Sequence, residues 1–293
     1  MRVYRTRFGI TTLCLTAAAV ALSWALPARA DSIRVLKSFS YDYLSGAYPY
    51  AGLVRGDDGA FYGTTTFDNP WGGYGTIFKM DSSGNVLTLH TFNWSDGAYP
   101  YYTMAKAADG SFYGTTYNGG SGGYGAAFRI DQDGNFTLFD TFKTASHWII
   151  YPTGLIAGSD GNFYGLSERT GGLGAVYKMD PAGNVTVLYY FTGAGDEGVV
   201  PSGRLVEGPD GKLYGTATHY GANGVGTAFR INKDGTGYQT LGHFGGLLGA
   251  YPTNNLVLAP DGNMYGTVSR GGASGGGVLF RLTTGGALTT VAA

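Results

Sequence analysis

A stretch of about fifty residues recurs five times along this 293-residue chain, and no other feature restricts the possible folds as much. A Tyr-Gly pair occurs once in each copy, at steps of 51, 51, 50 and 51 residues, at Tyr62, Tyr113, Tyr164, Tyr214 and Tyr265. An Asp-Gly pair precedes it with similar spacing, at Asp58, Asp109, Asp160, Asp210 and Asp261. An aromatic residue followed by a base comes later in each copy, at Phe78, Phe128, Tyr177, Phe229 and Phe280. Such a period is typical of repeat architectures in which each unit packs on its neighbours.

Each copy is predicted to contain four short strands. In the first copy these are a short apolar strand over residues 52–54, the Tyr-Gly-Thr-Thr stretch, Thr76–Met80 and Val86–Phe92. Asp-Gly and Gly-Asn turns accept positive φ and match strand twist, so adjacent strands should form hairpins. We therefore predict an all-β fold, a β-propeller of five four-stranded blades. The predicted blades lie within one domain, 31–293, and span residues 48–98, 99–150, 151–200, 201–250 and 251–293.

Either of two segments could form the strand that would close the propeller. Residues 33–39 read as a fourth strand with no blade before it, and such a strand can complete the last blade. Residues 287–291 could supply the same strand. A closed five-bladed ring is expected with either of them.

The motifs also resemble a known family. Gly-x-Phe/Leu-Tyr-Gly-Thr-Thr, followed by Gly-Gly and Gly-Thr-x-Phe, resembles the GloVer-type tandem repeat, named from Gloeobacter and Verrucomicrobia. The resemblance covers residues 48–286, and the third copy departs from it with Leu166-Ser167 in place of Thr-Thr. Relatives occur among "choice-of-anchor" exported proteins, so the resemblance implies export and a propeller-like fold. It implies no known activity and no catalytic residues.

Residues 1–30 are predicted to be a signal peptide. Arg2, Arg5 and Arg7 precede an apolar run, and Ala28-Arg29-Ala30 fits a cleavage site, so cleavage is expected after Ala30. The mature protein would be secreted or periplasmic, without a membrane span. It would carry 15 basic and 20 acidic residues, a net charge of −5, and no cluster of bases. We therefore expect no nucleic acid partner.

Function is predicted to lie on the face that carries the longer, variable loops. These are the second-to-third-strand loops and the blade-to-blade loops, whereas the other turns are short and uniform. Aromatic rings beside polar groups suit a glycan or another small polar ligand, because rings stack on the apolar face of a sugar. The residues predicted to bind it are Trp71, Trp94, Trp148, Tyr43, Asp68, Arg169, His219, Tyr220 and Arg270.

We expect a binding or scaffold protein rather than an enzyme, with two alternatives. One is a hydrolase or lyase acting on a polysaccharide or ester, and its candidate catalytic residues are Glu168, Asp196, Glu197, His147 and His219. These carboxylates and histidines occur singly, whereas turn aspartates recur in the repeats. The other alternative is a purely structural envelope protein. No metal site or cofactor is predicted, and the sequence does not indicate the oligomeric state.

Overall fold

The computed structural model describes residues 35–39, 46–68, 73–139, 142–144, 147–168, 172–252, 255–272 and 275–292. The chain divides into two units, Met1–Leu36 and Lys37–Ala293, and the fold described below belongs to the second. The predicted signal peptide lies outside the described residues.

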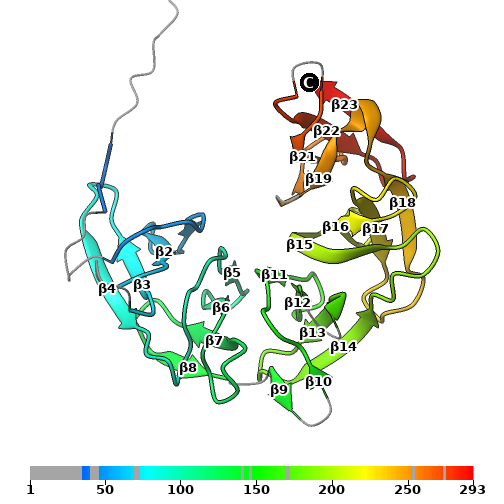
Figure 1. Ribbon diagram of the computed structural model, residues 1–293. Coiled ribbons are helices and arrows are strands. Elements are labelled where there is room, and N and C mark those ends of the chain that lie inside the picture. Colours follow the sequence, from blue (N-terminus) through cyan, green and yellow to red (C-terminus); the bar gives the residue numbers. More distant parts are fainter. Residues whose placement is uncertain are drawn as a thin grey trace, which may run out of the picture. The chain divides into compact units, whose positions relative to one another are not determined.

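Within the described residues, the second unit contains five antiparallel sheets of four or five strands, one for each sequence repeat, and this confirms the predicted propeller fold (Figure 1). Blade 1 comprises β1 (Val54–Arg55), β2 (Phe61–Thr65), β3 (Thr76–Met80) and β4 (Val86–Thr91). Blade 2 comprises β5 (Ala105–Lys106), β6 (Phe112–Thr116), β7 (Ala126–Ile130) and β8 (Phe136–Leu138). A short hairpin, β9 (Lys143–Thr144) and β10 (His147–Trp148), follows it.

The remaining three blades continue the same order. Blade 3 comprises β11 (Ile156–Ala157), β12 (Phe163–Ser167), β13 (Ala175–Met179) and β14 (Val185–Tyr190). Blade 4 comprises β15 (Gly198–Glu207), β16 (Leu213–Tyr220), β17 (Thr227–Ile231) and β18 (Gln239–His243). Blade 5 comprises β19 (Ala250–Pro252), β20 (Val257–Leu258), β21 (Met264–Arg270), β22 (Val278–Leu282) and β23 (Leu288–Ala292).

The recurring Tyr-Gly pair has a packing role in every blade. Its glycine lies under the aromatic ring of the third strand: a β-carbon on Gly63 would come within 2.6 Å of the Phe78 ring. In blades 1 to 4 the tyrosine beside it packs against the next blade, and the rings of Tyr62 and Phe112 stack with centroids 4.2 Å apart. The core therefore lies between neighbouring blades, which explains why these residue types recur together.

The Asp-Gly turn is tied to the same tyrosine. The Tyr62 hydroxyl donates to Asp58 over 2.8 Å, and Lys79 pairs with that carboxylate at 2.7 Å. The hydrogen bond from Lys79 is the main factor that lowers the pKa of Asp58. The equivalent tyrosines of blades 3, 4 and 5 make the same bond to their turn aspartates. The repeated acidic residues thus belong to the scaffold.

A second recurring contact joins each blade to the one before it. The residue before a proline has positive φ at Tyr48, Tyr99, Tyr151, Val200 and Tyr251, a conformation uncommon outside glycine. Within blade 2, the Tyr99 amide donates to the Tyr74 carbonyl of blade 1 over 2.9 Å. Pro100 then packs on Gly75, where a β-carbon would lie 2.7 Å from the proline ring. We call this contact the Tyr-Pro lock, and it recurs at Pro152, Pro201 and Pro252.

The outer strand of blade 5 comes from the C-terminal segment. Leu288–Ala292 pairs with β22, whereas Val35–Phe39 forms no strand. Ile33 and Arg34 lie outside the described residues. Phe39 nevertheless packs on Phe78 with ring centroids 5.1 Å apart, much as Phe92 of blade 1 packs on Phe128 at 5.3 Å. Of the two segments that the sequence offered, the C-terminal one forms the strand. The expected closed ring is not formed among the described residues, because Leu53 of blade 1 and Leu279 of blade 5 are 47% and 37% exposed where their counterparts in the other blades are buried.

Candidate binding surfaces

The blade-to-blade segments and the second-to-third-strand loops meet at the same end of each blade, as predicted. Ala47 pairs with Phe67, Ala98 with Asn118, and Pro152 with Ser167 in isolated antiparallel bridges. In blades 4 and 5 the same pairing is continuous, because β15 runs beside β16 and β19 beside β21. These bridges place the variable loops on one common face.

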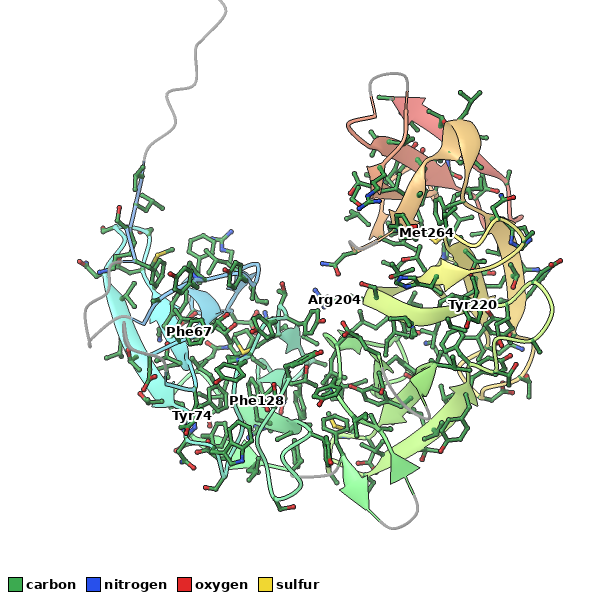
Figure 2. All side chains as sticks on the ribbon, viewed as in Figure 1. Phe67, Tyr74, Phe128, Arg204, Tyr220 and Met264 are labelled. Carbon is green, nitrogen blue, oxygen red and sulfur yellow. The ribbon has the colours of Figure 1, made fainter. Side chains whose placement is uncertain are left out.

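Six tyrosines from three blades gather on this face, and we call them the tyrosine surface. They are Tyr48, Tyr50, Tyr99, Tyr101, Tyr117 and Tyr151. Tyr50 and Tyr101 lie 6.2 Å apart between blades 1 and 2, and Tyr117 stacks on Tyr151 at 4.7 Å between blades 2 and 3. Phe67, marked on blade 1 in Figure 2, joins Tyr48 to Tyr99 through two edge contacts.

The rings of this surface remain accessible. Tyr50 is 66% exposed and Tyr48 41%, and the other four are partly buried. Their contacts cross the boundaries between blades, so the surface is continuous over blades 1 to 3 rather than a set of separate rings. Offset and edge-on rings of this kind present both apolar faces and hydroxyl groups to solvent.

A carboxylate is held at the edge of the tyrosine surface. Glu168 accepts a hydrogen bond from the Tyr102 hydroxyl over 2.9 Å and a longer one from Tyr117 over 3.4 Å. Burial, and then the neighbouring Glu168, raises the pKa of Tyr102, so this hydroxyl stays protonated and donates. Glu168 was predicted as a catalytic candidate, and the structure places it beside aromatic rings that the sequence reasoning did not select.

An arginine from blade 4 reaches toward the neighbouring blade. Arg204 donates from Nε and Nη2 to the Leu155 carbonyl of blade 3 over 3.0 and 2.6 Å (Figure 2). Its side chain lies against Gly154, and so does the β-carbon of Tyr102. Burial lowers the pKa of Arg204. Arg204 therefore fixes blade 3 to blade 4 close to the Tyr102–Glu168 pair.

The structure only partly locates the residues predicted to bind a ligand. Trp71, Tyr43 and Arg169 lie outside the described residues, and Trp148 and His147 are described only through the backbone of β10. Trp94 is 44% exposed and packs edge-on against Tyr74, which in turn contacts Tyr99. Asp68 accepts a hydrogen bond from the Tyr74 amide over 3.0 Å, which anchors that loop.

Two further predicted residues, His219 and Arg270, contact one tyrosine ring between blades 4 and 5. His219 contacts the Tyr251 ring with centroids 5.8 Å apart, and Arg270 lies over the same ring at 5.2 Å. Tyr220 is 52% exposed and has positive φ. The described contacts do not join this group to the tyrosine surface.

The remaining catalytic candidates, Asp196 and Glu197, have different environments. Glu197 is buried, and it accepts bonds from the Tyr189 and Thr192 hydroxyls and from the amides of Thr192 and Gly193. Asp196 is exposed beside it in a groove of about 370 Å³. Glu197 therefore anchors the loop between blades 3 and 4. The described contacts bring Glu168 to neither of them.

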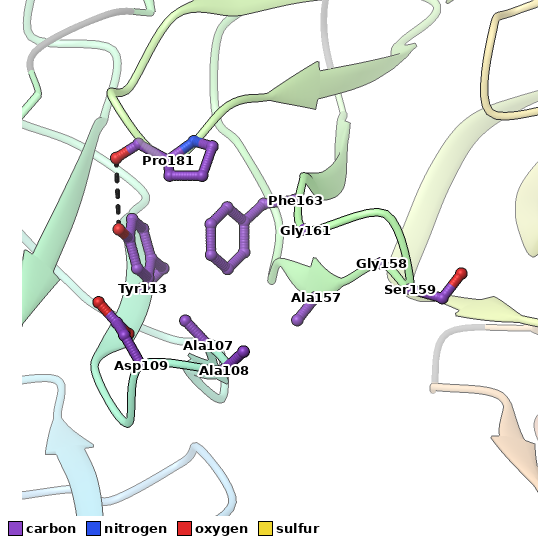
Figure 3. A pocket seen from close by; sticks show the side chains of 10 residues that line it. All are labelled: Ala107, Ala108, Asp109, Tyr113, Ala157, Gly158, Ser159, Gly161, Phe163 and Pro181. Carbon is purple, nitrogen blue, oxygen red and sulfur yellow. Dashed lines mark hydrogen bonds between the residues drawn. The ribbon is translucent and has the colours of Figure 1, made fainter.

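The opposite face holds a cleft that the sequence did not suggest. It measures about 630 Å³, lies between blades 2 and 3, and is lined mainly by small or apolar residues. Figure 3 shows Ala107 and Ala108 on one side and Ala157 on the other, with the rings of Tyr113 and Phe163 above them in this view. Tyr113 and Phe163 stack with centroids 4.0 Å apart.

This cleft exists because small residues replace the polar pairs that fill neighbouring seams. Between blades 1 and 2, Asp57 pairs with Lys106. Between blades 3 and 4, Ser159 donates to Glu207 over 2.6 Å, and Lys233 binds both. The matching positions between blades 2 and 3 hold Ala108, Ala157 and Pro181. Side chains too short to meet across the seam leave the space open.

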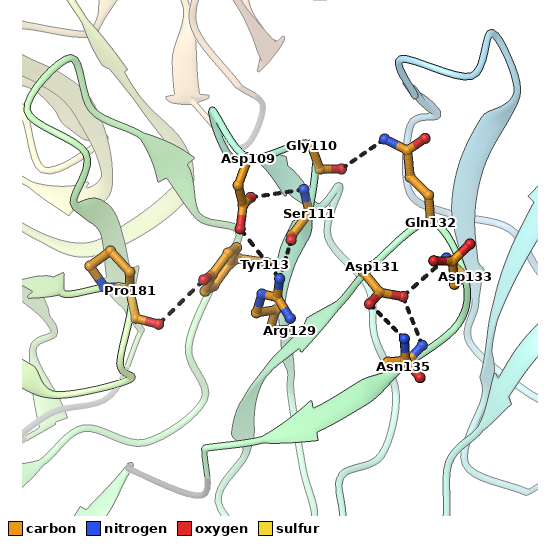
Figure 4. Close-up of polar contacts among 10 residues, drawn as sticks. All are labelled: Asp109, Gly110, Ser111, Tyr113, Arg129, Asp131, Gln132, Asp133, Asn135 and Pro181. Carbon is orange, nitrogen blue, oxygen red and sulfur yellow. Dashed lines mark hydrogen bonds and ion pairs between the residues drawn. The ribbon is translucent and has the colours of Figure 1, made fainter.

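The polar network beside the cleft is also altered. Tyr113 donates to the Pro181 carbonyl over 3.3 Å, and Tyr62 and Tyr214 make the equivalent bond to a carbonyl of the next blade (Figure 4). The counterparts of Tyr113 in the other blades also donate to their turn aspartates, a bond that is not found for Tyr113 among the described contacts. Asp109 instead pairs with Arg129 at 3.3 Å, and Arg129 also donates to Ser111 over 2.6 Å. The sequence signal for this site was the loss of charge at Ala108 and Ala157, which becomes visible only when the repeats are aligned.

Metal-ligand clusters and membrane-spanning helices are both absent from the described residues. No group of three or more His, Cys, Asp or Glu side chains is arranged to hold a metal ion there. Within the same residues no helix is long and apolar enough to cross a membrane.

Solved structures share the fold at low sequence identity. A gluconolactonase from Xanthomonas campestris is 17% identical with a TM-score of 0.55, and the alignment covers 85% of this chain and 77% of that one. A chain of a nidogen/laminin complex is 15% identical with a TM-score of 0.55, covering 82% and 79%. TolB from Acinetobacter baumannii is 17% identical with a TM-score of 0.51, covering 80% and 52%. At such identities the likeness shows the fold alone.

Sequence comparisons give a more specific assignment. A search of curated proteins gives no match. The profile of the Gloeobacter/Verrucomicrobia repeat matches residues 101–293. This is more than half of the chain, and it includes every strand of blades 2 to 5 named above. The chain therefore belongs to the Gloeobacter/Verrucomicrobia repeat family.

Proposed function

We propose that this protein is an exported, non-enzymatic binding protein that holds a glycan on its tyrosine surface. The observation that carries the proposal is the continuity of exposed and half-buried tyrosine rings across three blades. Sugars stack their apolar faces on such rings, and the ring hydroxyls hydrogen-bond to sugar hydroxyls. Several ring contacts in series favour a chain of sugars over a single one.

The carboxylate at the edge of the surface supports a polar ligand. Glu168 is oriented by two tyrosine hydroxyls and can accept further hydrogen bonds from a sugar. A neutral glycan suits this arrangement better than an anionic one, because a like charge near Glu168 would be repelled.

A glycan array followed by calorimetry tests the proposal. Tyr50→Ala and Tyr101→Ala should each weaken binding, and together by about tenfold or more, because each aromatic contact contributes about 0.5–1.5 kcal/mol. Both positions avoid the strained φ of the neighbouring lock tyrosines. Tyr190→Ala is the matched control, since Tyr190 is 47% exposed but lies at the end of β14.

The same experiment separates the competing functions. Binding unaffected by Tyr50→Ala with Tyr101→Ala would contradict the proposed surface. Release of shorter products from a bound glycan would instead support the hydrolase or lyase alternative, and a Glu168→Gln variant would then show whether this carboxylate takes part. A protein whose melting temperature no glycan raises would fit the purely structural alternative.

A further inference from the structure

The Tyr-Pro lock has two halves, a proline on one blade and the glycine hollow that receives it on the blade before. At each end of the blade series one of these halves is uncovered. Pro100, Pro152, Pro201 and Pro252 are all buried against the preceding blade, whereas Pro49 of blade 1 is exposed. Leu53 of blade 1 is 47% exposed, and its counterparts are at most 4% exposed, namely Met104, Leu155, Leu205 and Leu256. Blade 1 thus leaves exposed a proline and a leucine whose counterparts the other blades bury.

Blade 5 presents the complementary half. Leu279 is 37% exposed, while the equivalent residues of the other blades are completely buried, namely Ile77, Ala127, Val176 and Ala228. Tyr265 is partly exposed, although the equivalent Tyr62, Tyr164 and Tyr214 are completely buried. In the other blades the equivalent residues are buried against the following blade.

The hollow that receives the proline is also formed on blade 5. Gly277 has a φ of 111°, close to the 101° to 110° of Gly75, Gly125, Gly174 and Gly226, each of which lies against a proline of the next blade. No proline lies against Gly277 among the described residues. A hollow of about 450 Å³ opens there instead, lined by Gly276, Gly277, Leu279 and their neighbours.

We propose that this hollow and the exposed face around Leu279 bind blade 1 of a second copy of the chain, through its Pro49 and Leu53. The occupant follows from repetition, because the same hollow receives a proline of the next repeat four times within one chain. Pro49 is the one proline of this kind that is not already buried among the described residues. The outer strand of blade 5, β23, pairs with β22 and belongs to the same blade as the hollow. The contact is head-to-tail, with different surfaces on the two partners.

Sedimentation velocity on the purified full chain tests this proposal. The wild-type protein should associate as its concentration rises. Leu279→Glu should block the blade 5 half and Leu53→Glu the blade 1 half, because each would bury an unpaired charge in the contact. Each variant alone should therefore sediment as a monomer. An equal mixture should form a dimer and nothing larger, because each partner keeps one intact half.

Leu87→Glu is the control, since Leu87 is 62% exposed on β4, away from both halves, and should associate like the wild type. Circular dichroism melting should show that all variants fold. A wild-type protein that stays monomeric at every concentration would overturn the proposal, as would a mixture that fails to dimerise. If the monomer is also strongly destabilised by Leu279→Glu, the chain's own blade 1 occupies the hollow, and the proposal is wrong.

Discussion

At the scale of single residues, Tyr177 differs from its counterparts in the other four blades by one hydroxyl. Phe78, Phe128, Phe229 and Phe280 occupy the same place, and all of them are buried. The Tyr177 hydroxyl is fully buried without a hydrogen-bond partner among the described residues, and burial raises its pKa. A hydroxyl that loses its hydrogen bonds to water on folding and gains no protein partner lowers the stability of the folded state.

Tyr177→Phe should therefore stabilise the protein, by about 1–3 kcal/mol in the free energy of unfolding. Urea denaturation followed by circular dichroism measures the change. The reverse substitution in blade 4, Phe229→Tyr, is the matched control and should destabilise the protein. A loss of stability in Tyr177→Phe would mean that the hydroxyl has a partner after all.

His90 should make stability depend on pH near neutrality. Its ring stacks on Phe136 with centroids 3.7 Å apart, and Nε2 lies 3.3 Å from Asp96 without hydrogen-bond geometry. Burial lowers the pKa of His90, although Asp96 opposes the shift. Below about pH 6.5 the unfolded chain then binds more protons than the folded one, so stability falls as pH decreases.

The comparison of His90→Phe with the wild type isolates this effect. The variant keeps the ring stack and removes the titration, so its stability should decrease less between pH 7 and pH 5.5. Urea melts at several pH values give the two slopes. Equal slopes would show that the Asp96 charge cancels the effect of burial.

At the scale of elements, the seams between blades differ although the blades themselves are alike. The cleft between blades 2 and 3 follows from Ala108 and Ala157, where the first seam has Asp57 and Lys106. Ala108→Asp with Ala157→Lys should transplant that ion pair. A double-mutant cycle should give a coupling of about 0.2–1 kcal/mol, reduced by salt, because the pair is largely exposed to solvent. No coupling in low salt would mean that the two backbones are too far apart for this pair.

The sequence was sufficient to predict the strands of each blade but not the surfaces that the blades form together. Tyr-Gly, Asp-Gly and the aromatic-base pair predicted the blades, because each residue acts within its own repeat and its neighbour. Tyr99 and Tyr151 recur too, yet their role in the Tyr-Pro lock depends on a positive φ that a single sequence does not reveal. The tyrosine surface was not predicted, because its rings come from three repeats and meet only where the blades pack side by side.

At the scale of the whole molecule, stability should be distributed unequally along the blades. Each blade buries most of its apolar surface against its neighbours. A blade with one uncovered face should therefore have a smaller free energy of local opening. Blade 3 is covered on both faces, and Tyr164, Leu166 and Val176 are completely buried. Blade 5 exposes Leu279 on its outward face.

Hydrogen exchange at low protein concentration should show this inequality. The amides of β21 and β22 should exchange at least about tenfold faster than those of β12 and β13, which corresponds to about 1.4 kcal/mol in opening free energy. Raising the concentration should slow exchange in β21 and β22 selectively if blade 5 binds a second copy. Uniform exchange in all five blades would instead mean that the chain opens only as one cooperative unit, with the uncovered face contributing nothing to local opening.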